Sequence, residues 1–124
     1  NLSIAIMTGA NLTKVNLTNA ILNGVNLSNA KLIEADLSRA NLSGSNLAKA
    51  DLTKAQLRGT NISWTTMRGA NLEGCSLYRA NLSWSNLTEA NLNQAILIDT
   101  NLYQANLRDT QMVKTVMPDG IVNT

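Results

Sequence analysis

Hydrophobic positions along the chain follow a strict period of five. Every fifth residue from Leu2 to Met117 is Leu, Met or Ile, and these 24 positions hold 19 Leu, four Met and Ile62. A second register, running from Ala5 to Thr115, contains only Ala, Thr, Val, Ser and one Cys. All ten basic and all eight acidic residues lie outside both registers. The pattern therefore predicts two sets of inward-facing positions in every five residues.

Neither a helix nor a straight strand keeps every fifth side chain on one face. An α-helix rotates by about 100° per residue, so steps of five would spread the leucines around its surface. In a strand the side chains alternate, so residues five apart point to opposite faces. An array of amphipathic helices is the alternative, but it needs apolar spacings of three and four. We therefore expect a chain that turns once per repeat and stacks into a solenoid.

The individual repeats resemble a known family. Ala35–Arg39, Ala50–Lys54 and Ala90–Gln94 are similar to the pentapeptide-repeat consensus, A(D/N)LXX, and the resemblance covers essentially the whole chain. The closing segment, Thr115–Gly120, resembles the end of many cyanobacterial members. The resemblance implies an all-β fold, a right-handed quadrilateral parallel β-helix with four repeats per coil and about six coils. We expect one domain, residues 1–124, with the Leu/Ile/Met register buried throughout.

The composition offers little for catalysis. The chain has no His and a single Cys, its serines have no evident activating base, and its carboxylates face outward. We therefore expect no enzyme activity, no cofactor and no metal site. The formal net charge of +2 is too small to indicate nucleic-acid or membrane binding. Cys75 occupies a small inward position, which favours a buried structural residue over a reactive thiol.

Asn-Leu-Ser/Thr triplets recur along the chain, for example at Asn11 and Asn81. Each is formally a glycosylation acceptor, but the repeat generates these triplets by itself. We instead expect the Asn side chains to bond backbone groups at the corners and to stack as ladders, as in the column of Asn41, Asn61, Asn81 and Asn101.

One predicted side of the solenoid has no charged side chain. At twenty residues per coil, this side comprises residues 1–5, 21–25, 41–45, 61–65, 81–85 and 101–105. Trp64 and Trp84 are twenty residues apart and should be exposed on adjacent coils, with Tyr103 on the next coil. Exposed aromatic residues on a flat uncharged surface are typical of protein contacts. The alternative is that repeat drift placed the two indoles there without a contact role.

The other sides carry mixed charges. Lys14, Glu34 and Lys54 share one column, and Lys31 lies below Asp51, so we expect weak cross-strand ion pairs. On the fourth side the chain has three arginines near Tyr78, and they are Arg39, Arg58 and Arg79. Such a cluster can bind phosphate or an acidic partner, although acidic residues flank it.

The first coil carries Ile4, Ile6 and Met7 next to an open edge. We expect weak end-to-end association of rods through these residues. The alternative is that residues upstream of Asn1 form a cap, and such residues could also carry a targeting signal. The sequence does not specify the compartment, and we expect a cytoplasmic location. The opposite end is partly blunted by Pro118, which lacks an N–H, and by the turn at Asp119-Gly120.

The sequence therefore predicts a non-enzymatic rigid solenoid that binds an unknown protein partner or acts as a scaffold. The alternative function is inhibition of a type II topoisomerase by mimicry of DNA, as some family members do. That mimicry requires strongly negative sides, whereas this chain has more basic than acidic residues.

Overall fold

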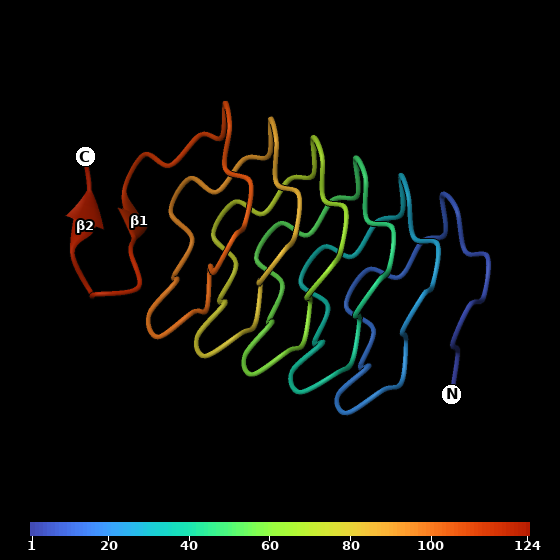
Figure 1. The fold of residues 1–124 in the computed structure, drawn as a ribbon. Helices are drawn as coiled ribbons and strands as arrows, with labels where there is room; N and C mark the ends of the chain where they lie inside the picture. Colours follow the sequence, from blue (N-terminus) through green and yellow to red (C-terminus); the bar gives the residue numbers. More distant parts are fainter.

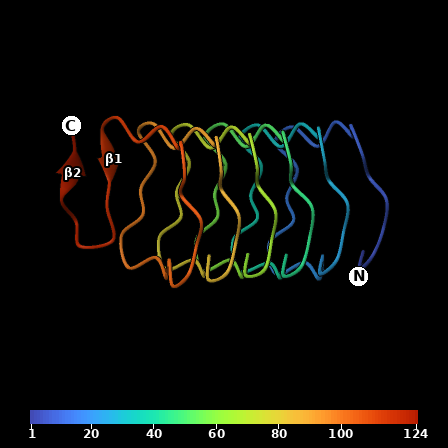
Figure 2. The same cartoon turned by 45° about the horizontal axis from the view of Figure 1, so that its top comes forward.

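The chain winds into a rod of stacked coils. A computed structural model describes residues 1–124, with no helix, and places the two termini at opposite ends of the rod (Figure 1). Nineteen isolated parallel β-bridges, from Ile6↔Asn26 to Ile96↔Val116, each join residues twenty positions apart. Each coil therefore contains twenty residues, which agrees with four repeats per coil. This arrangement is consistent with a β-helix, and the coils remain stacked in the turned view (Figure 2).

Each repeat makes one tight turn, and the turns share one backbone conformation. In the second coil, for example, the Ala30 N–H donates to the Leu27 carbonyl at 3.0 Å. The third residue of the turn, here Asn29, has a φ of 59°. A hydrogen bond from the fourth residue to the first, with positive φ at the third, is the combination found in type II turns. Every fifth residue from Ile4 to Lys114 has positive φ, including 17 that are not glycine.

Asparagine and aspartate side chains bond the turns internally, as expected from the sequence. The Asn61 Oδ1 accepts a hydrogen bond from the backbone N–H of Ser63 at 3.1 Å, and most repeats have the equivalent bond. This is an Asx-turn, which satisfies a backbone donor that no neighbouring coil reaches. The expected side-chain ladder occurs between Asn71 and Asn91, whose Oδ1 and Nδ2 lie 3.2 Å apart. In the predicted column of Asn41, Asn61, Asn81 and Asn101, the side chains form no hydrogen bonds with each other.

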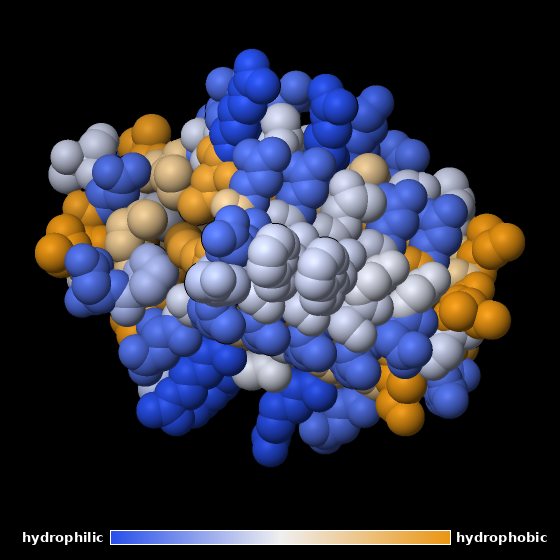
Figure 3. Space-filling view, viewed as in Figure 1, coloured by the Kyte–Doolittle hydropathy of each residue, from blue (hydrophilic) through white to orange (hydrophobic).

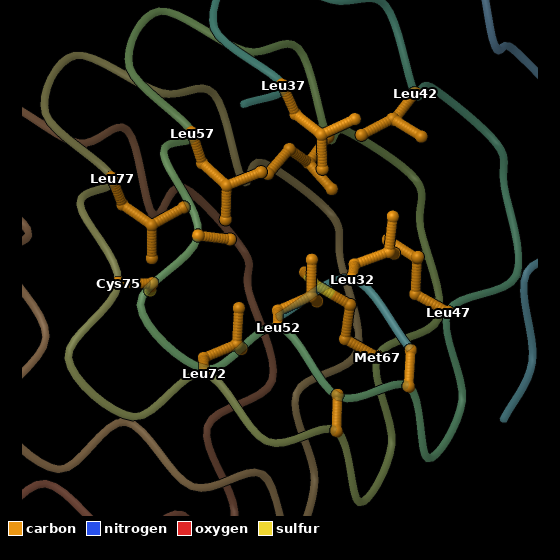
Figure 4. Close-up of a cluster of buried hydrophobic side chains, with 14 of the residues drawn as sticks. Leu32, Leu37, Leu42, Leu47, Leu52, Leu57, Met67, Leu72, Cys75 and Leu77 are labelled. Carbon is orange, nitrogen blue, oxygen red and sulfur yellow. The ribbon is translucent and has the colours of Figure 1, made fainter. Parts of the chain in front are cut away.

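The leucine register forms the core. From Leu22 to Leu97 its members are fully buried, and they stack on one another along the inside of the coils (Figure 4). The prediction that this register is buried throughout is wrong at both ends of the rod. Leu2 is 39% exposed, and the members from Met7 to Leu17 and from Leu102 to Met117 are only partly buried. A coil is covered on both sides only when it has a neighbour on each side.

From Val25 to Thr100 the small register is buried beside the leucines, including its hydroxyl residues. The Thr60 Oγ1 donates to the Leu37 carbonyl at 2.8 Å, and Thr100 and Thr115 make the same bond to leucines 23 residues earlier. These bonds allow a polar side chain to occupy the core. Ser45 is the exception, because its buried Oγ has no hydrogen-bond partner.

The two ends of the rod differ. In the first coil, the backbone N–H groups of Ile6, Asn11 and Asn16 have no hydrogen-bond acceptor in the chain. At the other end, β1 (Thr115–Val116) pairs antiparallel with β2 (Val122–Asn123), and the Gly120 N–H donates to the Met117 carbonyl. This hairpin covers part of the last coil, which confirms that this end is partly blunted. The structure contains no helix that could span a membrane.

Candidate contact face with stacked tryptophans

Trp64 and Trp84 form a stacked pair on the outside of the rod. Their ring centroids are 5.0 Å apart and their planes differ by 5°. This separation is close to the strand spacing of about 4.8 Å, so the coil geometry itself aligns the two indoles. Tyr103 packs edge-on against Trp84, with centroids 5.8 Å apart and an interplanar angle of 79°. The sequence therefore correctly predicted that these three aromatic residues come together.

The aromatic cluster is exposed. Trp64 is 64% exposed, Trp84 46% and Tyr103 63%. The positions on the two preceding coils in the tryptophan column are Gly24 and Gly44, so no side chain covers the outer face of Trp64 from that direction. Figure 3 shows pale residues of intermediate hydropathy along the middle of the visible face, between blue margins. The result is a rigid aromatic surface with a polar rim.

The turns do not need tryptophan at these positions. Trp64 and Trp84 have φ values of 56° and 61°, a region that bulky side chains disfavour and that glycine and asparagine tolerate. Other turns of the chain have Gly or Asn at the equivalent position, for example Gly44 and Asn29. Stacking contributes about 0.5–1.5 kcal/mol for the pair beyond burial, whereas the left-handed conformation costs about 1–2 kcal/mol at each of the two residues. The pair therefore adds little net stability, which leaves a contact role open.

The second set of predicted contact residues lies on the first coil. Ile4 is 79% exposed and Ile6 is 83% exposed, whereas Met7 is partly buried against the core. The Ile4 Cγ2 lies 3.1 Å from the position that a side chain on Gly24 would occupy. Hydrophobic side chains gather at both ends of the rod in Figure 3, while its sides are mostly polar.

The predicted column ion pairs do not form. Lys31 and Asp51 are bridge partners, yet neither they nor Lys14, Glu34 and Lys54 form a salt bridge. The three ion pairs that do form are Arg68–Glu89, Arg79–Asp99 and Arg108–Asp109. Side-chain rotamers decide which groups meet, and a shared column does not ensure contact. All three pairs are exposed, so each contributes about 0–1 kcal/mol.

Cys75 is a core residue, as the sequence indicated. It is fully buried, and burial raises the pKa of its thiol to about 12. The thiol is therefore protonated and shielded at neutral pH, which makes it a poor nucleophile. No group of three or more His, Cys, Asp or Glu residues is placed to hold a metal ion.

Comparisons with known proteins agree with this geometry. The family model described as pentapeptide repeats matches residues 1–33, 10–47, 35–74 and 75–112. A comparison with curated proteins finds no match.

Three solved structures of cyanobacterial pentapeptide repeat proteins are similar to the chain. Rfr23 from Cyanothece 51142 is 36% identical over 79% of this chain, with a TM-score of 0.45, and the chain spans 64% of its length. The protein alr5209 from Nostoc PCC 7120 is 28% identical over 86% of this chain and 83% of its own, with a TM-score of 0.66. HetL, involved in the regulation of heterocyst differentiation in Nostoc sp. strain PCC 7120, is 29% identical over 97% of this chain and 73% of its own, with a TM-score of 0.38.

Proposed function

Because the chain belongs to the pentapeptide-repeat family, we propose that it is a non-enzymatic rigid solenoid of about six coils that binds a partner protein. The contact surface is the uncharged side that carries Trp64, Trp84 and Tyr103. The observation that carries this proposal is the stacked, exposed tryptophan pair. Aromatic residues of this kind dominate the binding energy at the centres of protein interfaces.

Preorganisation supports the proposal. Each indole is attached to a turn whose backbone is hydrogen-bonded to the next coil, for example the Trp64 N–H to the Ser83 carbonyl at 3.0 Å. The rings also restrain each other, so little side-chain entropy remains to be lost on binding. The coils hold the two indoles in fixed positions relative to each other. Tyr103, which packs against Trp84, adds a hydroxyl group beside them.

The test is a binding experiment with a double variant, Trp64→Ala plus Trp84→Ala. We expect it to fold with a nearly unchanged melting temperature but to lose the partner that the wild-type protein captures from a native lysate. The matched control is Gln94→Ala plus Lys114→Ala, which changes two exposed residues at the same turn position on adjacent coils of another side. The control should retain the captured partner.

Fluorescence gives an independent readout, because the chain contains only these two tryptophans. Adding the captured partner should shift and saturate their emission. A large loss of stability in the double variant, together with unchanged capture, would make the pair structural and overturn the proposal.

Mimicry of DNA has no observation in its favour. The exposed ion pairs mix both charges. The arginine-bearing side carries three arginines and three aspartates, so it is not negative. We therefore expect no inhibition of gyrase supercoiling at micromolar protein.

For the 124-residue chain, we also propose a weak end-to-end contact through Ile4, Ile6 and Met7. Two exposed isoleucines and the unpaired N–H groups of the first coil support it. Residues upstream of Asn1 that covered this coil would remove the contact.

A further inference from the structure

A polar hollow opens on the side of the rod that carries the arginines. Its volume is about 450 Å³, and no hydrophobic residue lines it. Three of the lining residues are Arg39, Arg58 and Arg79, and Gly59 lies among them. This side is distinct from the tryptophan-bearing one, so the hollow is independent of the proposed protein contact.

The hollow exists because Gly59 interrupts a column of side chains. Arg39, Gly59 and Arg79 occupy the same turn position on successive coils, with φ values of 59°, 64° and 58°. At the equivalent position on the next side, Trp64 and Trp84 fill adjacent coils and stack. A side chain at residue 59 would begin 3.4 Å from the Arg39 Cγ and would fill the space between the two arginines.

Tyr78 holds two of the guanidinium groups in place. The Arg58 Cζ lies 4.9 Å from the centre of the Tyr78 ring, and the Arg79 Cζ lies 5.0 Å from it. In a cation–π contact of this kind, the ring face attracts the positive charge of the guanidinium group. They restrict two long side chains that would otherwise be mobile, so the positive charges are already gathered before a ligand arrives.

The arginines have unused binding capacity. Arg39 and Arg58 form no salt bridge. Arg79 contacts Asp99 through its Nε at 3.6 Å, which leaves the two terminal nitrogens of the guanidinium for another acceptor. Planar, positively charged guanidinium groups bind phosphate oxygens in a bidentate manner.

A carboxylate and two hydroxyls line the rest of the hollow. Asp36 lies there with Thr18 and Ser38. Hydrogen bonding from the side chain of Ser38, and then from its backbone N–H, lowers the pKa of Asp36. The carboxylate is therefore ionised at neutral pH and acts only as a hydrogen-bond acceptor. It would repel a bare anion, but it would bind a hydroxyl group of a ligand whose anionic part lies on the arginines.

We propose that this hollow binds a small phosphorylated polyol, such as a sugar phosphate, with the phosphate on Arg39, Arg58 and Arg79 and a hydroxyl on Asp36. Three guanidinium groups match the three terminal oxygens of a phosphate monoester. The Asp36 carboxylate distinguishes such a ligand from inorganic phosphate. A sugar phosphate can place a neutral hydroxyl on Asp36 while its phosphate stays on the arginines. Inorganic phosphate could reach Asp36 only by bringing its negative charge close to the carboxylate.

The flanking charges favour a single anionic group over a polymer. On the C-terminal side, the column that contains Gly59 and Arg79 continues with Asp99 and Asp119. On the N-terminal side, Asp36 borders the hollow. A nucleic-acid strand running along the rod would meet these carboxylates on both sides of the arginines. The site therefore fits one compact anion.

The test is a titration of the ¹⁵N-labelled protein, followed by NMR, with ribose 5-phosphate, inorganic phosphate and neutral ribose as separate probes. We expect saturable shifts centred on the amide of Gly59 with ribose 5-phosphate, weaker binding of inorganic phosphate, and no shift with ribose. A single-stranded oligonucleotide is the fourth probe. Tighter binding of the oligonucleotide than of ribose 5-phosphate would overturn the assignment.

Four variants separate charge from shape. Arg39→Ala and Arg58→Ala should each weaken ribose 5-phosphate binding by about tenfold or more, because each removes a charge-assisted hydrogen bond. Gly59→Asn keeps all three arginines and tolerates positive φ, but it fills the hollow and should abolish binding. Asp36→Asn keeps the acceptor for the Ser38 N–H and should remove the preference for ribose 5-phosphate over inorganic phosphate.

The matched control is Arg68→Ala, an exposed arginine on another side, which should bind as the wild type does. Thermal unfolding of each variant checks that it folds. Shifts that never saturate, shifts spread over all basic residues, or unchanged affinity in Gly59→Asn would each overturn the proposal. The binding of a lysate protein by the tryptophan face is measured separately, so either proposal can fail without the other.

Discussion

The middle and the ends of this rod are built from the same repeat, yet they differ in how deeply the leucines of that repeat are buried. Leu52 in a middle coil is fully buried, whereas Leu2 in the first coil is 39% exposed. Both residues occupy the same position of the same five-residue unit. Burial in this fold is therefore supplied by the neighbouring coil, and the repeat alone does not specify it.

Hydrogen bonding shows the same difference. The Asn26 N–H donates to the Ala5 carbonyl of the preceding coil, but the Ile6 N–H has no acceptor in the chain. At the other end, the N–H groups of Leu102 and Leu107 also lack acceptors in the chain. A middle coil is thus stabilised by contacts with two neighbouring coils, whereas an end coil contacts only one. The rod behaves as a one-dimensional chain of coupled units.

The largest expected effect comes from a charge placed in a middle coil. Leu72→Asp puts a carboxylate at a fully buried position with no partner, at a cost of several kcal/mol. Since the total stability of a domain is about 5–15 kcal/mol, we expect this variant not to fold. Circular dichroism and size-exclusion chromatography would show the loss of structure.

The control is the same substitution at Leu12, which is only partly buried. We expect Leu12→Asp to fold, with disorder limited to the first coil. If Leu72→Asp melted near the wild-type temperature, the five-residue core register would be wrong. If the two variants were equally damaged, the distinction between middle and end coils would fail.

A smaller effect separates hydrogen bonding from burial within the middle. Ser45 and Ser85 are both 2% exposed at equivalent positions two coils apart. The Ser85 Oγ donates to the Leu82 carbonyl, whereas the Ser45 Oγ has no partner. We expect Ser85→Ala to lower the free energy of unfolding by about 1 kcal/mol, and Ser45→Ala to leave it unchanged or raise it. Chemical denaturation of both variants measures the difference, and equal losses would contradict it.

The smallest expected effect is on self-association through the first coil. Sedimentation over a concentration series should show weak association of the 124-residue chain at high concentration. Ile4→Lys plus Ile6→Lys should abolish it without changing the melting temperature, because both side chains are already exposed. A strict monomer at all concentrations, unaffected by these substitutions, would rule out the end contact.

Much of the fold could be predicted from the sequence, because a period of five has few physical solutions. The buried leucines of the middle coils follow from it, and the recurrent Asn and Asp indicate bonded turns. The twenty-residue pairing follows from the family resemblance, which implies four repeats per coil, and so does the proximity of Trp64 and Trp84. These features depend on the backbone path, which the repeat determines.

Features that depend on side-chain conformation or on missing neighbours could not be predicted. The left-handed turn position holds six of the seven glycines of the chain, which is a signal for positive φ, but it also holds Trp, Glu, Lys and Asp, which give none. The Arg68–Glu89 pair joins residues 21 positions apart, across two columns, and not within one. The hollow at Gly59 becomes visible only when the surrounding arginine side chains are placed.

The twenty-residue pairing also constrains how such a gene can change length. Deleting or duplicating five residues would keep every leucine inside, but it would shift everything downstream by one side of the coil. Such an event between Trp64 and Trp84 would separate the two indoles, although the core would remain intact. A change of twenty residues would preserve both the core and the surface pattern. Length changes in multiples of twenty are therefore the ones that conserve binding surfaces, while other multiples of five create new combinations of side chains on an unchanged scaffold.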